Sequence, residues 1–173
     1  MPEKKTIERA RRDKREGKAP TTQAGEFVRE EIEHIREGKH GARSAAQAVA
    51  IGLSKARRAG VELPPPEKGK ASEKTRSSAR RALEAGREKP LAKPSPKRSR
   101  ATIQALKRES PAAASEKALS RQAKAAAKDR TAGERSAAAR KAARTKGPAE
   151  RAEAAQKAAR TRAKRQSERG GRS

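Results

Sequence analysis

Alanine supplies most of the apolar residues of this chain, and this limits what the chain can bury. Hydrophobic residues make up 31% of its 173 positions, but 38 of them are alanine, with one Phe, one Met and no Trp, Tyr or Cys. Burying an alanine methyl yields about 0.8 kcal/mol, against roughly 1.5–3 kcal/mol for a Leu or Phe side chain. Ordering the backbone costs about 1–2 kcal/mol per residue. We therefore expect most of the chain to lack a packed core.

The chain also has a large surplus of positive charge, with 47 Lys and Arg against 21 Asp and Glu and a formal net charge of +26. Low hydrophobicity combined with high net charge is typical of disordered chains. The net charge is +4 over residues 1–20, +1 over 21–63 and +21 over 64–173. Self-repulsion opposes compaction and favours a polyanionic partner, of which nucleic acid is the obvious class.

Several classes of protein are not expected. No apolar run approaches the roughly 18 residues of a membrane span, and no signal-peptide core follows the N-terminus. The absence of cysteine excludes a disulfide framework, a thiolate nucleophile and Cys-ligated zinc. No phosphate-binding loop or nucleophile elbow is present, so we expect no enzyme, no small-molecule substrate and no cofactor. We expect a cytoplasmic protein located at the nucleoid.

The large apolar side chains gather in residues 21–63, where their spacing predicts an antiparallel helical hairpin. The first helix is expected to begin at Thr21 or Thr22 and to end at Gly38. Its apolar stripe consists of Phe27, Val28, Ile32 and Ile35.

In the second helix, Ser44 is the expected N-cap and Gln47 the expected partner in a capping box. Gly52 allows the two helices to approach closely, and Gly60 ends the helix. Acids of the first helix are expected to attract the basic residues of the second. Because roughly 40 residues is the lower limit for folding unaided, we expect dimerisation, a protein partner, or docking of additional apolar residues, namely Ile7, Val61 and Leu63.

Composition divides the chain into four parts. These are a basic N-terminal segment (1–20), the helical hairpin domain (21–63), a Pro-rich basic linker with one short helix between Ser72 and Gly86 (64–98), and an Ala/Lys/Arg-rich tail (99–173).

The tail contains two 16-residue repeats, and nine of thirteen positions are identical when Glu134–Lys146 is set over Glu150–Arg162. Its helix-forming segments are expected to be short, with breaks at Thr131–Gly133 and Gly147–Pro148. Short segments with like charges at i,i+4 spacing are marginal alone. We therefore expect a mainly α protein, with a small N-terminal helical hairpin followed by a long, basic, disordered or transiently helical tail. The tail would fold as phosphates neutralise it; the alternative is a disordered solubilising tail.

The linker contains KPSPKRSR, a Ser-Pro turn followed by basic residues. It resembles the minor-groove-binding units of linker-histone tails, in which a turn presents two cations along a groove of negative potential. The alternative is a plain basic linker. The candidate nucleic-acid contacts are Lys39, Arg43, Lys55, Arg57, Arg58, Lys97, Arg98, Arg100, Arg140, Lys141, Arg144, Lys146, Arg160, Arg162, Lys164 and Arg165.

A metal site is considered and not expected. Glu30, His34 and Glu37 share one face of the first helix at i, i+4 and i+7, but His40 follows the expected helix end. Acids on such a face normally contact solvent or, here, the basic second helix.

A resemblance to a known family rests on two stretches, TQAGEFVREEIEHIREGKHGARSAAQAVAIGLSKARRAGVELPPP and SRATIQALKRESPAAASEKALSRQAKAAAKDR. They resemble small basic bacterial proteins that are described as a domain of unknown function, and sometimes as histone-like or DNA-binding, with a linker-histone-like tail. The resemblance covers residues 1–63 and 97–165. It implies a class and a domain boundary, but no reaction and no site residues.

The expected function is therefore non-sequence-specific binding of nucleic acid, most readily DNA, by a histone-like, nucleoid-associated protein. A single, buried Phe argues against stacking on single-stranded bases, and the absence of Asn argues against a base-reading helix. Two alternatives stay open. One is an RNA- or ribosome-associated basic protein, and the other is a hydrophilin-like stress-protection protein, in which acids usually balance bases.

Overall fold

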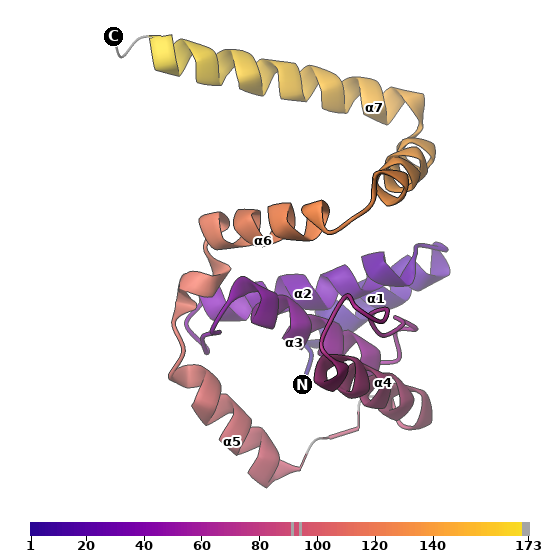
Figure 1. The fold of residues 1–173 in the computed structure, drawn as a ribbon, viewed down its shortest axis with the longest axis vertical. Coiled ribbons are helices and arrows are strands. Elements are labelled where there is room, and N and C mark those ends of the chain that lie inside the picture. Colours follow the sequence, from indigo (N-terminus) through magenta and orange to yellow (C-terminus); the bar gives the residue numbers. More distant parts are fainter. Residues whose placement is uncertain (91, 94, 171–173) are drawn as a thin grey trace. The chain divides into compact units, whose positions relative to one another are not determined.

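The computed structural model describes residues 1–170 apart from 91 and 94, and the side chains of these residues apart from 145, 146, 165 and 168–170. This described part contains seven α-helices and one 3-10 helix and is 75% helical. Figure 1 shows the fold as a ribbon. The elements are α1 (Lys4–Arg15), α2 (Pro20–Arg36), α3 (Ala45–Arg58), α4 (Glu73–Glu88), α5 (Pro96–Lys107), η1 (Pro111–Ala114), α6 (Glu116–Lys128) and α7 (Ala132–Gly170). The chain divides into unit 1, Met1–Ala123, and unit 2, Lys124–Ser173.

The predicted fold class, a hairpin followed by a disordered tail, is wrong. The expected hairpin is present as α2 and α3, but α1 precedes it in the N-terminal segment and α4 follows it in the expected linker. The expected tail consists of α5, η1, α6 and α7. The description of the chain as intrinsically disordered fails for the same reason, and so does the expectation that the tail folds only when it binds phosphates.

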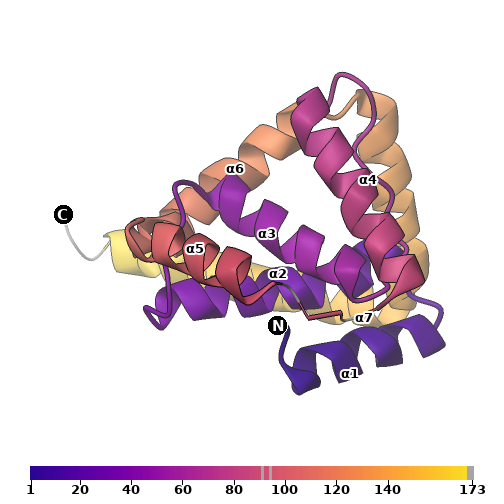
Figure 2. The ribbon, with the colours of Figure 1, turned by 90° about the horizontal axis from the view of Figure 1, so that it is seen from below.

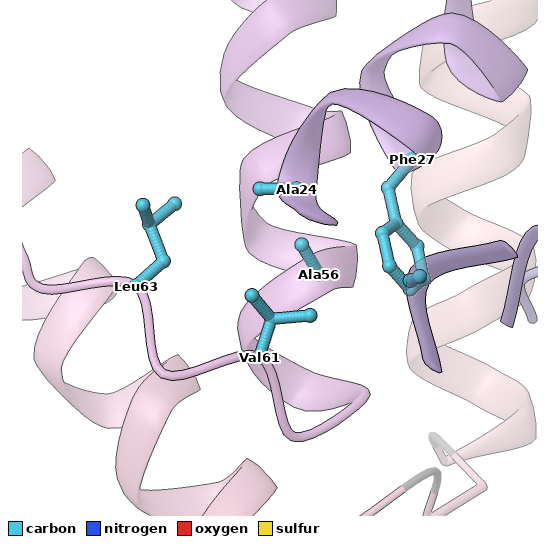
Figure 3. Close-up of a cluster of buried hydrophobic side chains, with 6 residues drawn as sticks. Ala24, Phe27, Ala56, Val61 and Leu63 are labelled. Carbon is cyan, nitrogen blue, oxygen red and sulfur yellow. The ribbon is translucent and has the colours of Figure 1, made fainter. Parts of the chain in front are cut away.

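The main core of unit 1 lies where α1 and the segment after α3 close over the hairpin. In unit 1, α1 packs against α2, and α4 packs against α3 (Figure 2). The buried side chains Ala24, Phe27, Ala56, Val61 and Leu63 converge in one cluster (Figure 3), which Ala10 of α1 completes. Ile7 packs against this cluster. The predicted docking of Ile7, Val61 and Leu63 is therefore confirmed, and it supplies the apolar area that two helices alone lack.

A second core cluster forms at the other end of the hairpin, where η1 contacts α2 and α3. Its buried side chains are Ile35, Ala42, Ala48, Ala113 and Ala114. The amides of Gly41 and Ala42 donate to the carbonyls of Leu106 (2.9 Å) and Ser110 (3.2 Å). A Cβ on Gly41 would lie 1.9 Å from the carbonyl oxygen of Glu109. Small side chains therefore let part of the expected tail bond directly to the hairpin backbone.

Most predicted helix ends of the hairpin are confirmed. Gly38 follows the end of α2 with a φ of 72°, a left-handed conformation that suits glycine. Ser44 caps α3 by accepting a hydrogen bond from the Gln47 amide (3.2 Å), while the Gln47 side chain accepts from the Arg43 amide (2.7 Å). The predicted start of α2 at Thr21 or Thr22 is wrong. The helix begins at Pro20, whose ring suits the first helical position because that position needs no N–H.

Helix α4 begins after Ser72, as predicted, and the Ser72 hydroxyl accepts a hydrogen bond from the Thr75 amide (3.2 Å). Gly86, however, lies inside the helix and does not end it. A Cβ on Gly86 would lie 1.9 Å from the carbonyl oxygen of Arg57. Glycine is therefore required at this position for α4 to approach α3. A sequence pattern does not distinguish a glycine at a helix contact from a glycine at a helix end.

Helix α7 begins where a break was expected. The Thr131 hydroxyl accepts from the Glu134 amide (3.1 Å), and the Thr131 amide donates to the Glu134 carboxylate (2.6 Å), which is a capping box. Gly147, with a φ of 66°, and Pro148 interrupt the helix as predicted. The high helix propensity of Ala, Arg, Lys, Gln and Glu accounts for the helix on both sides of this kink.

We predict that Gly86→Ala lowers the free energy of unfolding of the full chain by about 1–3 kcal/mol, the usual cost of overpacking. The control is Gly25→Ala, because Gly25 is exposed in α2 and a Cβ there would meet nothing within 4 Å. This control should be neutral or stabilising by up to about 1 kcal/mol. Urea denaturation followed by circular dichroism measures both. Equal stability of the two variants would contradict the packing of α4 on α3.

A second prediction concerns the ion pair that ties α4 to the segment after α3. Arg87 Nε lies 3.2 and 3.0 Å from the two carboxylate oxygens of Glu62, and these hydrogen bonds lower the pKa of Glu62. A lowered folded-state pKa stabilises the fold above the unfolded pKa of about 4.3, and this contribution is lost as the pH falls through the folded value.

Glu62→Gln should therefore be slightly less stable than the wild type at pH 6–8, and the difference should shrink as the pH falls below about 4.3. The free energy of unfolding measured from pH 8 downward checks this. The control is Glu88→Gln, an exposed carboxylate next to Arg87 on α4. A difference that does not change with pH would contradict the assigned ion pair.

Candidate functional site

The structure distributes the sixteen candidate phosphate contacts among very different surroundings. Arg57 is buried, with 5% of its surface exposed. Its Nε and Nη2 donate to the carbonyls of Leu63 and Pro64, both at 3.0 Å. Burial lowers the pKa of Arg57. This side chain holds the segment that carries Val61 and Leu63 into the core, so it is not accessible to a phosphate.

Three other candidates in unit 1 are engaged in ion pairs. Lys55 Nζ lies 2.5 Å from Glu31 Oε2 and 3.8 Å from Glu30 Oε1, which confirms the expected attraction between the two hairpin helices. Arg43 pairs with Glu109 at 3.6 Å.

The third of these candidates, Lys39, pairs with Glu37 at 2.9 Å and with Glu3 at 3.6 Å. These carboxylates, Glu37 above all, raise the pKa of Lys39. Arg58, by contrast, is exposed on the last turn of α3.

Lys97, Arg98 and Arg100 are exposed near the beginning of α5. Ser95 is the N-cap of this helix and Pro96 its first residue. The basic residues after the Ser-Pro pair therefore lie on a helix and not in an extended turn. The positive end of the helix dipole adds to their charge at this end of α5.

The candidates in unit 2 lie on α7, and those whose side chains the structure describes are exposed. Five of these candidates have described side chains that make no hydrogen bond or ion pair, namely Arg140, Arg144, Arg160, Arg162 and Lys164. Lys141 is also exposed but takes part in an interaction. The side chains of Lys146 and Arg165 lie outside the described part of the structure.

Cations occur on opposite sides of the second half of α7. At about 100° per residue, Lys157, Arg160 and Lys164 follow one side of the helix, and Arg151 and Arg162 follow the other side. Over unit 2 there are 16 basic and 5 acidic residues. This helix therefore presents positive charge in more than one direction.

The structure also brings together His34 and His40, which the sequence analysis considered for a metal site, with Glu31, which it did not consider. Ligand atoms of Glu31, His34 and His40 lie within 4.8 Å of one another. The two imidazole rings have centroids 6.3 Å apart in an edge-on arrangement. His40 reaches this place because the left-handed Gly38 turns the chain back over the end of α2. The Glu-x-x-His spacing was visible in the sequence, but the return of His40 was not.

Arg57→Gln and Arg58→Gln separate the structural and the exposed arginine. We predict that Arg57→Gln destabilises the fold by roughly 2–3 kcal/mol, because the carbonyls of Leu63 and Pro64 lose charge-assisted hydrogen bonds and the first of these bonds is buried. Arg58→Gln should change stability by less than about 0.5 kcal/mol. Urea denaturation of the full chain measures both values. If the two variants are equally stable, Arg57 has been assigned the wrong role.

Within the described residues, no helix has the length and apolar content that crossing a membrane requires. No protein-family model matches the chain, and neither a curated protein nor a solved structure is similar to it.

Proposed function

We propose that this protein binds nucleic acid without sequence preference, through contacts between basic side chains and phosphates, and that double-stranded DNA at the nucleoid is its target. The observation that carries the proposal is a set of exposed α7 cations whose side chains make no hydrogen bond or ion pair, namely Arg140, Arg144, Arg160, Arg162 and Lys164. A folded chain that keeps such charges close together on one helix has to offset their mutual repulsion. Binding a polyanion and releasing its counterions does so.

The two units differ in a way that favours this proposal. Unit 1 has 31 basic and 16 acidic residues, and ten of its basic side chains lie in the described ion pairs. In unit 2 the basic residues outnumber the acidic ones by 16 to 5. We therefore assign the main phosphate contacts to α7, with Lys97, Arg98 and Arg100 of α5 as additional contacts.

Helix α7 suits binding to more than one phosphate backbone. Its cations lie on opposite sides, so a duplex bound to one side leaves charge exposed on the other. A protein of this kind brings duplexes together, and compaction or protection of DNA is the role that follows. The helical tail also means that binding uses helices already formed, in place of the coupled folding expected from the sequence.

The test is a filter-binding or gel-shift series on duplex DNA across salt concentrations, with two variants of the full chain. One variant replaces four exposed cations of α7 by Gln: Arg140, Arg144, Arg160 and Lys164. The matched control replaces four ion-paired cations of unit 1 by Gln: Lys18, Lys39, Arg76 and Arg87. Both variants lose the same net charge.

We predict that the α7 variant binds more weakly and that its plot of log affinity against log salt is shallower by roughly 3–4 units, about 0.9 for each lost phosphate contact. The control should lose much less. Equal losses in both variants would show that only overall charge matters. If neither variant loses affinity, or if the wild type does not bind at low salt, the proposal fails. Competition by duplex RNA at one salt concentration separates DNA from RNA binding.

A further inference from the structure

The carboxylate of Glu31 is in an unusual position for a charged group. The residue has no exposed surface, and its Oε1 accepts no hydrogen bond. Oε2 is 2.5 Å from Lys55 Nζ, which supplies one positive partner. Oε1 has a different neighbour, His40 Nε2, at 3.4 Å. Burying a carboxylate costs free energy unless its charge is paired. The question is therefore which positive species lies between Oε1 and His40 Nε2.

The orientation of His40 leaves a lone pair on the nitrogen that faces Glu31. His40 Nδ1 lies 3.1 Å from the Gly41 carbonyl oxygen. A carbonyl oxygen can only accept, so Nδ1 bears the proton of this hydrogen bond. In a neutral ring Nε2 is then an acceptor that faces another acceptor, Glu31 Oε1. Only a positive species between them, either a proton on Nε2 or a metal ion, turns this repulsion into attraction.

The distance between His40 and Glu31 fits a metal ion. Zinc binds His nitrogen and carboxylate oxygen at about 2.0–2.2 Å in tetrahedral geometry, which places neighbouring ligand atoms roughly 3.3–3.6 Å apart. The 3.4 Å between His40 Nε2 and Glu31 Oε1 lies in this range. His34 follows Glu31 by three residues on α2, and its ligand atom lies within 4.8 Å of the other two.

Both histidines also have the support that metal ligands usually have. A ligating histidine commonly donates its second ring nitrogen to a carbonyl or a carboxylate, which fixes the ring. His40 meets the Gly41 carbonyl in this way, and His34 Nε2 lies 3.0 Å from Glu3 Oε1. These contacts come from three segments, the N-terminus, α2 and the turn after it, so a bound ion would tie the three together.

The local charge favours a cation even though the chain as a whole is strongly basic. Glu30 and Glu31 are both buried, and Lys55 is the ammonium that lies near both of them. Glu30 Oε1 likewise accepts no hydrogen bond. The two buried carboxyl groups therefore outnumber the one ammonium that their described ion pairs supply.

We propose that Glu31, His34 and His40 form a binding site for one divalent transition-metal ion, with Zn²⁺ the best match to the ligand set. Nitrogen ligands select against Mg²⁺ and Ca²⁺, which prefer oxygen. Three protein ligands leave the fourth position to solvent. Glu31 binds through Oε1 while Oε2 keeps its contact with Lys55. The site uses none of the residues to which we assign phosphate contacts, and it does not depend on the proposed function.

The test uses the metal-free full chain without nucleic acid. Zn²⁺ is titrated against a chromophoric chelator, and Co²⁺ is titrated separately, because tetrahedral Co²⁺ has strong visible absorption bands. We expect one ion per chain, tetrahedral Co²⁺ bands, and a rise of the melting temperature on addition of Zn²⁺.

His34→Gln, His40→Gln and Glu31→Gln should each weaken Zn²⁺ binding more than tenfold. Glu33→Gln is the matched control, because Glu33 is an exposed carboxylate on the same helix outside the cluster, and it should bind like the wild type. His34 is not part of either core cluster, so its variant keeps the fold, which circular dichroism checks. Absence of one-to-one binding, or equal affinity in all variants, overturns the proposal and assigns the space between Glu31 and His40 to a proton.

Discussion

Close approach between backbones, made possible by glycine and alanine, is the constraint on which unit 1 depends. A Cβ on Gly52 would lie 2.6 Å from Cα of Val28, and one on Gly86 or Gly41 would lie 1.9 Å from a carbonyl oxygen of another segment. At such distances many small groups make van der Waals contact, and dispersion adds up over them. The core is therefore stabilised by close contact between backbones and small side chains, and not by large apolar side chains.

The same proximity explains why charged groups are buried in unit 1. With few large apolar residues, the interface between α2 and α3 also includes Glu30, Glu31 and Lys55. Such groups are costly to bury, and removing one partner is more costly than keeping the pair. Arg57 makes the same kind of contribution on the other side of α3, where it bonds to the carbonyls of Leu63 and Pro64. Polar contacts thus select one arrangement of the helices. Packing of alanine side chains alone would not distinguish this arrangement from similar ones.

The two units use positive charge differently. In unit 1 many cations have carboxylate partners, and their charge is part of the fold. Along α7 the cations are exposed and the acids are few, so the helix depends on its own propensity and has charge left for a partner. A single net charge of +26 therefore conceals cations that pair with carboxylates inside the fold and cations that are exposed along α7, which only the tertiary structure distinguishes.

Local rules explain what could be predicted about the fold. The hairpin, the Ser44 and Ser72 caps, the Gly38 end and the Gly147–Pro148 kink follow from residues within a few positions of one another, and the structure has them all. The disordered tail was a wrong prediction because composition measures the area available for burial. Composition gives no information about a capping box such as that of Thr131 and Glu134, or about the length over which a helix continues without a break.

The sequence by itself determined the helical hairpin, the basic charge and several helix ends, such as the Ser44 and Ser72 caps and the Gly38 end, because these depend on near neighbours along the chain. Only the tertiary structure decided that Gly86 is a contact and not a stop, that Arg57 is internal while Arg58 is exposed, and that His40 returns to Glu31. Each of these depends on what a distant segment places next to the residue, and side-chain identity alone carries no information about that neighbour.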